Sequence, residues 1–334
     1  MIKEMLAKVV EKEDLTRAEM TAAFTEIFEG KATNAQIAAL ITALRMKGET
    51  IDEITACAQV MRQHALPFES DEELLEIVGT GGDCAHTFNI STTAAFVIAA
   101  SGTKVAKHGN RSVSSHSGAA DVLEALGADI SPELDVAYAQ LAGSNMVFLF
   151  AQKYHEAMRY AGPVRKESGI RTVFNILGPL TNPAQAKLQV MGVYDKRLVY
   201  PLARVLSNLG VRRGLVVNGD GLDEFSLTGT NSVAEISEGC ITQYDINAGD
   251  LGLAPCSKED IVGGYARDNA VITRDILGGS LRGAKRDTVL LNAGAGLYVA
   301  DKAKSLQEGI QLAAELIDSG AARQTMDRFV QLSR

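Results

Sequence analysis

The sequence has no apolar run long enough to cross a lipid bilayer. Its longest such run is Thr93–Ala100, whereas a membrane-spanning helix needs about 20 apolar residues. The first residues, MIKEMLAKVVEKEDL, mix both charge signs and lack a long apolar core, so we expect no signal peptide. The sequence therefore predicts a protein that does not associate with membranes.

Basic residues and cysteines are also scarce. The 334 residues include 33 Lys and Arg against 41 Asp and Glu, which gives a formal net charge of −8. An acidic balance provides no general attraction for nucleic acid or anionic membranes, so an anionic ligand needs a local site. The four cysteines, Cys57, Cys84, Cys240 and Cys256, are far apart and lack metal-ligand spacing. Free thiols in a reducing cytoplasm are the simplest interpretation.

The first part of the chain has the pattern of short capped helices. In the S/T-x-x-E/Q arrangement, each side chain can bond a backbone N–H that the helix leaves unpaired. Apolar residues then recur at helical spacing, and Gly30 and Gly48 stand where helices commonly end. Three predicted helix starts have this arrangement: Thr16 with Glu19, Thr33 with Gln36, and Thr50 with Glu53.

After Pro67, short apolar runs alternate with helical stretches, which predicts a largely parallel sheet covered by helices. The predicted strands are Leu74–Val78, Thr103–Ala106, Asn145–Phe150, Leu188–Val193 and Leu215–Val217, and the helices between them are Thr92–Ser101, Ala119–Leu126 and Leu198–Leu209. From Thr288 onward the chain is predicted to be mostly helical. At about 100–200 residues per domain, the length fits two domains. We expect a small helical domain at 1–68, with the crossover 160–188 packed on it, and an α/β domain formed by 69–159 and 189–334.

Two segments that follow predicted strands have the composition of phosphate-binding loops. In VGTGGDCAHTFNIST, Val78–Thr92, the glycines allow close backbone approach, and Ser91 is the predicted N-cap of the next helix. In Lys107–Gly127, basic and small polar residues precede another helix, which suits a polyanion. A ligand-free turn and a solvated basic loop are the alternatives. Because ligands of open α/β sheets bind at strand ends, two such loops together favour binding.

Two further segments carry charges suited to ligands. Asp223 and Glu224 are adjacent in a glycine-rich turn after a predicted strand, and paired carboxylates suit Mg²⁺ that shares substrate phosphates. Carboxylates facing bare phosphate would repel it unless a cation lay between them. In the segment Tyr154–Pro183, Arg165 could form a fork to a carboxylate. An exposed acidic turn and a solvated basic crossover are the respective alternatives.

These residues together resemble the anthranilate phosphoribosyltransferase family of tryptophan biosynthesis over nearly the whole chain. The motifs that carry the resemblance are GTGGD at Gly79–Asp83, NIST at Asn89–Thr92, KHGNRSVSS at Lys107–Ser115, PVRKE at Pro163–Glu167, the Gly169–Pro183 segment and GLDE at Gly221–Glu224. The resemblance implies transfer of the phosphoribosyl group from 5-phosphoribosyl 1-pyrophosphate to anthranilate. It also implies Mg²⁺, two ions per subunit, and a homodimer formed through the helical domain.

The resemblance also implies roles for individual residues. Because the attacking aromatic amine is already neutral near pH 7, we expect no acid–base catalyst of the ordinary kind. The residues implied to bind phosphoribosyl pyrophosphate are Gly79, Gly82, Asp83, Thr87, Asn89, Ile90, Ser91, Thr92, Lys107, His108, Gly109, Asn110, Arg111, Ser112, Val113, Ser114, Ser115 and Ala119. Those implied for anthranilate are Gly79, Asn110 and Arg165, with His108 and His155 nearby. Ser91, Asp223 and Glu224 are implied to hold metal.

Four positions depart from the usual family pattern: Cys84 in place of Gly, Ala119 in place of Ser, Glu156 in place of Pro and Ser168 in place of Leu. If position 84 needs a positive φ, a cysteine there is strained. Two other functions stay open at this point. One is a pyrimidine nucleoside phosphorylase, which shares the expected architecture. The other is a non-catalytic relative that binds nucleic acid, although the net charge of −8 argues against it.

Overall fold

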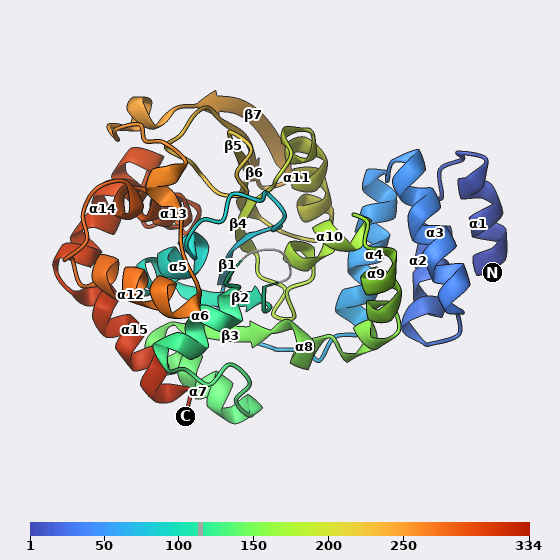
Figure 1. The fold of residues 1–334 in the computed structure, drawn as a ribbon, viewed down its shortest axis with the longest axis horizontal. Helices are drawn as coiled ribbons and strands as arrows, with labels where there is room; N and C mark the ends of the chain where they lie inside the picture. Colours follow the sequence, from blue (N-terminus) through green and yellow to red (C-terminus); the bar gives the residue numbers. More distant parts are fainter. Residues whose placement is uncertain (113–115) are drawn as a thin grey trace.

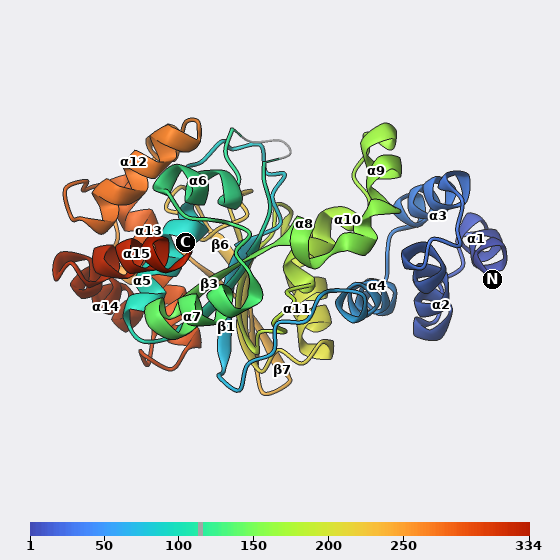
Figure 2. The ribbon, with the colours of Figure 1, turned by 90° about the horizontal axis from the view of Figure 1, so that it is seen from below.

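Four helices at the amino terminus stand beside a larger α/β unit in the computed structural model, which describes residues 1–112 and 116–334 (Figures 1 and 2). Their bounds are α1 Ile2–Val10, α2 Arg17–Phe28, α3 Asn34–Lys47 and α4 Ile51–Gln63. All three predicted capping boxes are confirmed. In each, the side chain of the threonine at 16, 33 or 50 accepts a hydrogen bond from the backbone N–H of the third helical residue. The side chain of that third residue accepts one from the backbone N–H of the threonine. Gly48 ends α3 with φ 92°, a conformation that glycine adopts without strain.

The α/β unit is built on a seven-stranded sheet in the described residues, with the order β3-β2-β1-β4-β5-β6-β7. Its strands are β1 Leu74–Gly79, β2 Lys104–Gly109, β3 Met146–Phe150, β4 Leu188–Gly192, β5 Arg213–Gly219, β6 Asn231–Ser237 and β7 Cys240–Ile246. The first five strands are parallel, whereas β6 and β7 pair antiparallel at one edge. The mostly parallel α/β architecture is therefore confirmed, and β6 and β7 are additions that the sequence pattern did not predict.

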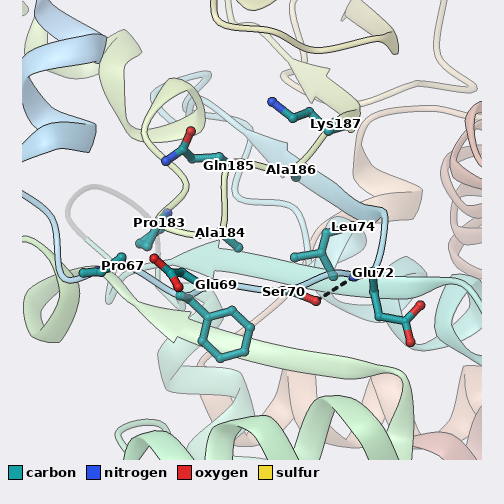
Figure 3. Close-up of a pocket in the computed structure, with 11 residues that line it drawn as sticks. Pro67, Glu69, Ser70, Glu72, Leu74, Pro183, Ala184, Gln185, Ala186 and Lys187 are labelled. Atoms are coloured by element: carbon teal, nitrogen blue, oxygen red, sulfur yellow. Dashed lines mark hydrogen bonds between the residues drawn. The ribbon is translucent and has the colours of Figure 1, made fainter.

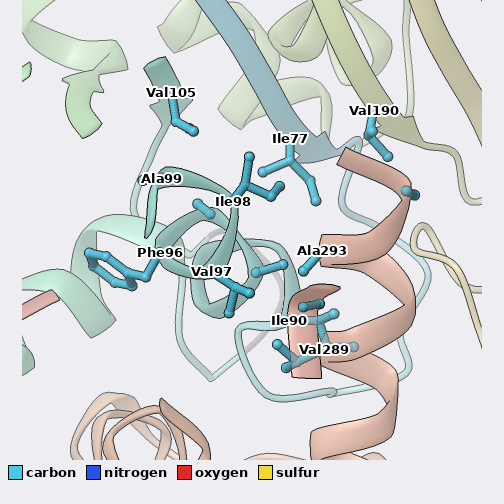
Figure 4. Packing of buried hydrophobic residues seen from close by; sticks show 14 of the residues in the cluster. Ile77, Ile90, Phe96, Val97, Ile98, Ala99, Val105, Val190, Val289 and Ala293 are labelled. Atoms are coloured by element: carbon cyan, nitrogen blue, oxygen red, sulfur yellow. The ribbon is translucent and has the colours of Figure 1, made fainter. Parts of the chain in front are cut away.

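Helices cover both faces of the sheet (Figure 1). The bounds of the longer ones are α5 Ile90–Ala100, α6 Ala119–Leu126, α7 Leu134–Ser144, α11 Val199–Asn208, α12 Ala266–Leu277, α13 Ala284–Val299, α14 Leu306–Asp318 and α15 Ala321–Leu332. Figure 4 shows α5 and α13 side by side against the sheet, with Ile98 of α5 facing Ile77 of β1 and Ala293 of α13 nearby. None of the helices in the described part of the chain is both long and apolar enough to cross a membrane.

The crossover after β3 joins the helical bundle to the sheet. After α8, Ala151–Tyr154, the crossover at 160–188 contains α9 Gly162–Ser168 and α10 Phe174–Leu177. The Phe174 ring lies 5.6 Å from the Phe24 ring of α2, centroid to centroid. Leu177 belongs to the same buried cluster as Leu44 of α3 and Leu202 of α11. The bundle, the crossover and one face of the sheet thus share a continuous core. The domain limits drawn from the sequence stay a prediction.

A cavity of about 270 Å³ lies where the chain passes from the bundle to the sheet (Figure 3). It is lined by residues from Pro67 to Leu74 and from Pro183 to Lys187, which lead into β1 and β4. This places it at the amino ends of those strands. The predicted phosphate loops follow the carboxyl ends, so this cavity lies at the opposite ends of the strands from those loops. Its lining includes Glu69 and Glu72, which would repel an anion.

Candidate active site

The Asp223–Glu224 turn lies directly against the carboxyl ends of three neighbouring strands. A Cβ atom added at Gly192, the last residue of β4, would lie 1.7 Å from the Asp223 carbonyl oxygen. One added at Gly79 of β1 would lie 2.2 Å from Asp223 Oδ2, and one at Gly219 of β5 would lie 2.3 Å from the Glu224 carbonyl oxygen. Real Cβ contacts are never this short, so these strands must end in glycine for the carboxylate turn to approach.

The first glycine-rich loop binds this turn through its backbone. The N–H of Gly81 donates to Asp223 Oδ2 at 2.5 Å, and the N–H of Ser91 donates to Glu224 Oε1 at 3.2 Å. The three residues implied as metal ligands, Ser91, Asp223 and Glu224, are therefore brought together. Burial and the nearby Asp83 carboxylate hold the pKa of Asp223 well above its ordinary value. Burial likewise raises the pKa of Glu224 to about 7, against the opposing charge of Lys107.

The donor set suits a hard divalent cation whose coordination is completed from outside the protein. Asp83, Asp223 and Glu224 crowd their negative charges together, and a bound cation would relieve that repulsion. Within residues 1–112 and 116–334, no three His, Cys, Asp or Glu side chains form a metal site by themselves. Mg²⁺ usually keeps several waters and shares substrate phosphate oxygens, so the donor set fits a magnesium ion held jointly with a phosphorylated substrate.

Lys107 lies beneath the first loop and is fully buried. Its Nζ donates to the Ile77 carbonyl at 2.7 Å and to Ser91 Oγ at 3.1 Å. Burial lowers the pKa of Lys107 to about 8, while the carboxylates of Glu224 and Glu76 oppose the shift. Lys107 therefore fixes the Ser91 hydroxyl and places a positive charge between two buried carboxyl groups.

Glu76 is a buried residue near the site that the sequence interpretation missed. It accepts a hydrogen bond from the His108 backbone N–H at 3.2 Å, and burial raises the pKa of its carboxyl to about 8. The signal in the sequence was a single charge inside the apolar strand LLEIVG. A charged residue in such a strand needs partners. For Glu76 these are hydrogen bonds from the Asn182 side chain and the His108 N–H, together with the attractive charge of Lys107 on the adjacent strand.

The second loop is attached to α6. The Arg111 guanidinium donates to Glu124 at 2.6 and 2.8 Å and to Asp121 at 3.0 Å, and the Ser112 N–H donates to Asp121 at 2.9 Å. Arg111, implied to bind the donor substrate, is thus paired with acidic side chains of α6. Three other residues implied for this role, Val113, Ser114 and Ser115, lie outside the described residues.

Asn89 links the two loops. Its Nδ2 donates to the Ser117 carbonyl at 3.1 Å, and its Oδ1 accepts from Asn269 of α12 at 3.0 Å. Thr87 pairs with Val262 in an isolated β-bridge. The predicted N-cap at Ser91 is wrong, because α5 begins at Ile90 and Asn89 occupies the N-cap position. The first intrahelical hydrogen bond runs from the Thr93 N–H to the Asn89 carbonyl at 3.0 Å, and the Ser91 N–H donates to Glu224.

The remaining positions of the loops offer mainly backbone groups. The side chains of Ile90 and Thr92 are each 1% exposed. Gly109 ends β2, and an added Cβ there would lie 2.9 Å from the Phe148 ring. Ala119 is the first residue of α6. Contacts from these positions to a ligand would therefore be made by N–H and C=O groups.

His108 and His155 form a buried pair at the site where the crossover meets the sheet. Their ring centroids are 5.0 Å apart, at an interplanar angle of 59°. Burial lowers the pKa of His108 to about 3 and that of His155 to about 4, so both rings are neutral near pH 7. His108 Nδ1 lies 3.2 Å from the Gly178 carbonyl and must carry the proton, because a carbonyl only accepts. Both Nε2 atoms are buried without a hydrogen-bond partner among the described residues.

Arg165 and Asn110 complete the group implied for the acceptor. The Arg165 guanidinium lies over the Phe174 ring, with Cζ 5.2 Å from its centroid, and burial lowers the pKa of Arg165. The side chain of Asn110 accepts from Gln152 Nε2 at 3.3 Å and from the Arg111 N–H at 2.8 Å. Arg165 belongs to the crossover and Asn110 follows β2, so the two residues come from opposite sides of the predicted domain boundary.

The departures from the family pattern have local structural consequences. Cys84 adopts φ 59°, so the strain anticipated for a non-glycine residue at this position is present. The Ser168 hydroxyl donates to the Val164 carbonyl at 2.7 Å in the last turn of α9. Glu156 begins a short 3₁₀ helix, Glu156–Arg159.

Comparisons with known proteins agree with this architecture. A model of the glycosyl transferase family α/β domain matches residues 71–323, and a model of the helical bundle domain of the same family matches residues 3–65. A protein of Methanobrevibacter smithii named anthranilate phosphoribosyltransferase is 54% identical over 332 residues, which covers 99% of each chain.

Solved structures are similar over the same length. The anthranilate phosphoribosyltransferase (TrpD) of Thermus thermophilus superposes with a TM-score of 0.94 at 42% identity and covers 98% of this chain and 99% of its own. The Saccharomyces cerevisiae enzyme in complex with PRPP and Mg has a TM-score of 0.88 at 26% identity and covers 99% and 98%. Since these matches span the whole chain and reach 54% identity, the chain belongs to the anthranilate phosphoribosyltransferase family.

Proposed function

We propose that this enzyme transfers the 5-phosphoribosyl group from 5-phosphoribosyl 1-pyrophosphate to the amine of anthranilate, as in tryptophan biosynthesis. The amine nitrogen forms a bond to C1 of the ribose, and the C1–O bond breaks with its electron pair leaving on pyrophosphate. The nitrogen then releases a proton, giving N-(5-phosphoribosyl)-anthranilate. One observation carries the proposal: the glycine-rich loop and the basic loop both meet the Asp223–Glu224 turn at the carboxyl ends of the strands.

The donor substrate is proposed to lie between the two loops. We propose that its phosphate oxygens bind the segments Gly79–Asp83, Asn89–Thr92 and Lys107–Ser115. The N–H groups of Thr80, Gly81 and Ser91 take no part, because they already donate to Gly192, Asp223 and Glu224. Lys107 holds the Ser91 hydroxyl in position. Fixed donors of this kind act by orientation and electrostatic stabilisation, which suits a reaction whose nucleophile is already neutral near pH 7.

Magnesium is proposed to join the donor substrate to Ser91, Asp223 and Glu224, with two ions per subunit. Support comes from the crowded carboxylates described above and from the yeast relative, whose structure contains PRPP and Mg. When bound, the metal would neutralise the charge that develops on the leaving pyrophosphate. The protein residues hold their carboxylates ready for it through the backbone N–H groups of Gly81 and Ser91.

Anthranilate is proposed to bind between Arg165 and the pair His108 and His155, near Gly79 and Asn110. The half-buried guanidinium of Arg165 can bind its carboxylate. The unpartnered Nε2 atoms can accept hydrogen bonds from its amine. A yeast relative in complex with 4-fluoroanthranilate, with a TM-score of 0.87 at 26% identity, supports an aromatic acceptor in this fold. The relatives compared are all anthranilate phosphoribosyltransferases, which favours this reaction over nucleoside phosphorolysis or nucleic-acid binding.

The direct test of the proposed function is the loss of anthranilate fluorescence after addition of 5-phosphoribosyl 1-pyrophosphate and Mg²⁺. The combined variant Asp223→Asn with Glu224→Gln should lower turnover by roughly 100-fold or more, because it removes the charges proposed to hold the metal. Asp220→Asn is the matched control, since Asp220 has φ 56° and asparagine tolerates that conformation. Turnover of the combined variant equal to that of the control would refute the metal-binding role.

The assembly and location of the protein are further proposals. We propose a homodimer through the helical domain, supported by the family resemblance and by exposed apolar side chains such as Met46 on α3, which is 80% exposed. Sedimentation of Met46→Lys beside the unaltered protein tests this. We also propose a cytoplasmic location, supported by four free cysteines and the absence of a long apolar helix in the described residues.

A further inference from the structure

A second cavity, of about 490 Å³, lies beside the first loop and is lined almost entirely by polar and charged side chains. Its lining comes from three parts of the chain: α3, the crossover, and the segment after β4 that contains a 3₁₀ helix, Lys196–Leu198. We name it the arginine cavity. The residues that line it are Arg45, Arg171, Tyr194, Asp195, Arg197 and Leu198, none of which belongs to the substrate sites proposed above.

The arginine cavity has an excess of positive charge. Arg197 is compensated, because its Nε and Nη2 donate to Asp195 at 3.1 and 2.6 Å. The guanidinium of Arg45 forms no ion pair or side-chain hydrogen bond with any residue in the described ranges. Arg171 bonds the Gly82 carbonyl and stacks on Tyr194, with Cζ 4.4 Å from the ring centroid, and neither contact neutralises its charge. Two guanidinium charges are thus left for an anion.

The wall of this cavity is connected to the loop that faces the carboxylates. Besides the bond from Arg171 to the Gly82 carbonyl, the Tyr194 N–H donates to Thr80 Oγ1 at 3.3 Å. The Thr80 N–H in turn donates to the Gly192 carbonyl at 3.0 Å. Asp83 is the next residue after Gly82. The wall of the arginine cavity and the carboxylate turn therefore contact the same short loop.

The lining identifies the class of ligand. Leu198 is its single aliphatic residue, and Arg171 covers the face of Tyr194, so the cavity offers little surface to an aromatic acceptor. Two planar forks suit phosphate groups. We propose that the arginine cavity is a second anion site that binds inorganic pyrophosphate after it has left the ribose. The source of the pyrophosphate rests on the proposed function, whereas the binding site does not.

Titration calorimetry tests the proposal directly. Pyrophosphate is added at fixed free Mg²⁺ to protein already saturated with 5-phosphoribosyl 1-pyrophosphate, without anthranilate. We expect one binding event, which Arg45→Gln weakens by about tenfold or more, since a charge-assisted contact is lost. Arg45 is exposed on α3, so its substitution should leave folding intact. The matched control is Arg204→Gln on α11, which removes the same charge outside the cavity and should leave binding unchanged.

Several outcomes would overturn the proposal. One is that pyrophosphate does not bind to protein saturated with the donor substrate. Another is that the Arg45→Gln and Arg204→Gln variants bind pyrophosphate with equal affinity. Inorganic phosphate binding as tightly as pyrophosphate, or benzoate binding more tightly, would reject pyrophosphate as the occupant. In kinetics, pyrophosphate should inhibit the unaltered enzyme in a mixed manner against the donor substrate and the Arg45→Gln variant competitively. Absence of all turnover would refute the proposed function instead, because the calorimetric result does not depend on catalysis.

Discussion

Replacing Gly192 with alanine should disable the site while leaving the fold largely intact. Gly192 is the last residue of β4, and the Asp223 peptide passes over it. The new Cβ would lie 1.7 Å from the Asp223 carbonyl oxygen and 2.1 Å from its carbonyl carbon. These atoms belong to the backbone, so no side-chain rotation relieves the overlap.

The size of the effect follows from the displacement required. Contacts shorter than 3.0 Å are essentially never made by a real Cβ, so the turn must move by about 1.3 Å. A misplacement of about 1 Å in a catalytic group typically costs on the order of 100-fold in rate. Overpacking of this kind also destabilises a protein by about 1–3 kcal/mol. We therefore expect turnover to fall at least about 100-fold, with a moderate loss of stability.

The assay combines anthranilate fluorescence with urea unfolding of the same variant. Gly249→Ala is the control, since nothing lies within 4 Å of a Cβ at that position and its φ is not positive. The fall in turnover should appear at temperatures where circular dichroism shows Gly192→Ala to be folded. Activity within a few fold of Gly249→Ala would show that the carboxylate turn is not positioned as described.

Two further predictions concern the acceptor site. Arg165→Ala should raise the KM for anthranilate far more than the KM for the donor substrate, as steady-state kinetics would show; equal increases would remove Arg165 from the acceptor site. The KM for anthranilate, measured at saturating donor and Mg²⁺, should stay flat from pH 8 to pH 6, because burial lowers the pKa of His108 to about 3 and that of His155 to about 4 and both rings remain neutral. A rise with an apparent pKa near the ordinary value of about 6.5 would contradict the buried, neutral pair.

The sequence predicted those parts of the fold whose signals are local. A capping box needs only two residues three positions apart, and all three boxes formed. The buried parallel strands are continuous apolar runs because helices cover both faces. Edge strand β7, with the sequence CITQYDI, alternates between exposed and half-buried residues, so it has no such run and was missed. Its half-buried residues Ile241, Tyr244 and Ile246 pack against the two core clusters, but polar residues separate them in the sequence.

The site was predictable in its loops but not in its supporting contacts. The residues of the glycine-rich loop and the Asp223–Glu224 pair stand out in the chain because their types serve phosphate and metal. Glu76 of β1 accepts a hydrogen bond from the backbone of His108 on β2. Arg171 bonds the Gly82 carbonyl, which is 89 positions away in the sequence. Such contacts are set by strand order and by the path of the crossover, which the local pattern does not specify.

The claim on which the account depends is that two strand-end loops and one carboxylate turn bind a single donor molecule. A crystal structure of the protein with 5-phosphoribosyl 1-pyrophosphate and Mg²⁺ tests it most directly. We predict one donor molecule touching Gly79–Asp83 and the loop after β2, with its pyrophosphate joined through metal to Asp223 and Glu224. Density for the donor at another place, with its pyrophosphate not joined through metal to Asp223 or Glu224, would contradict the account.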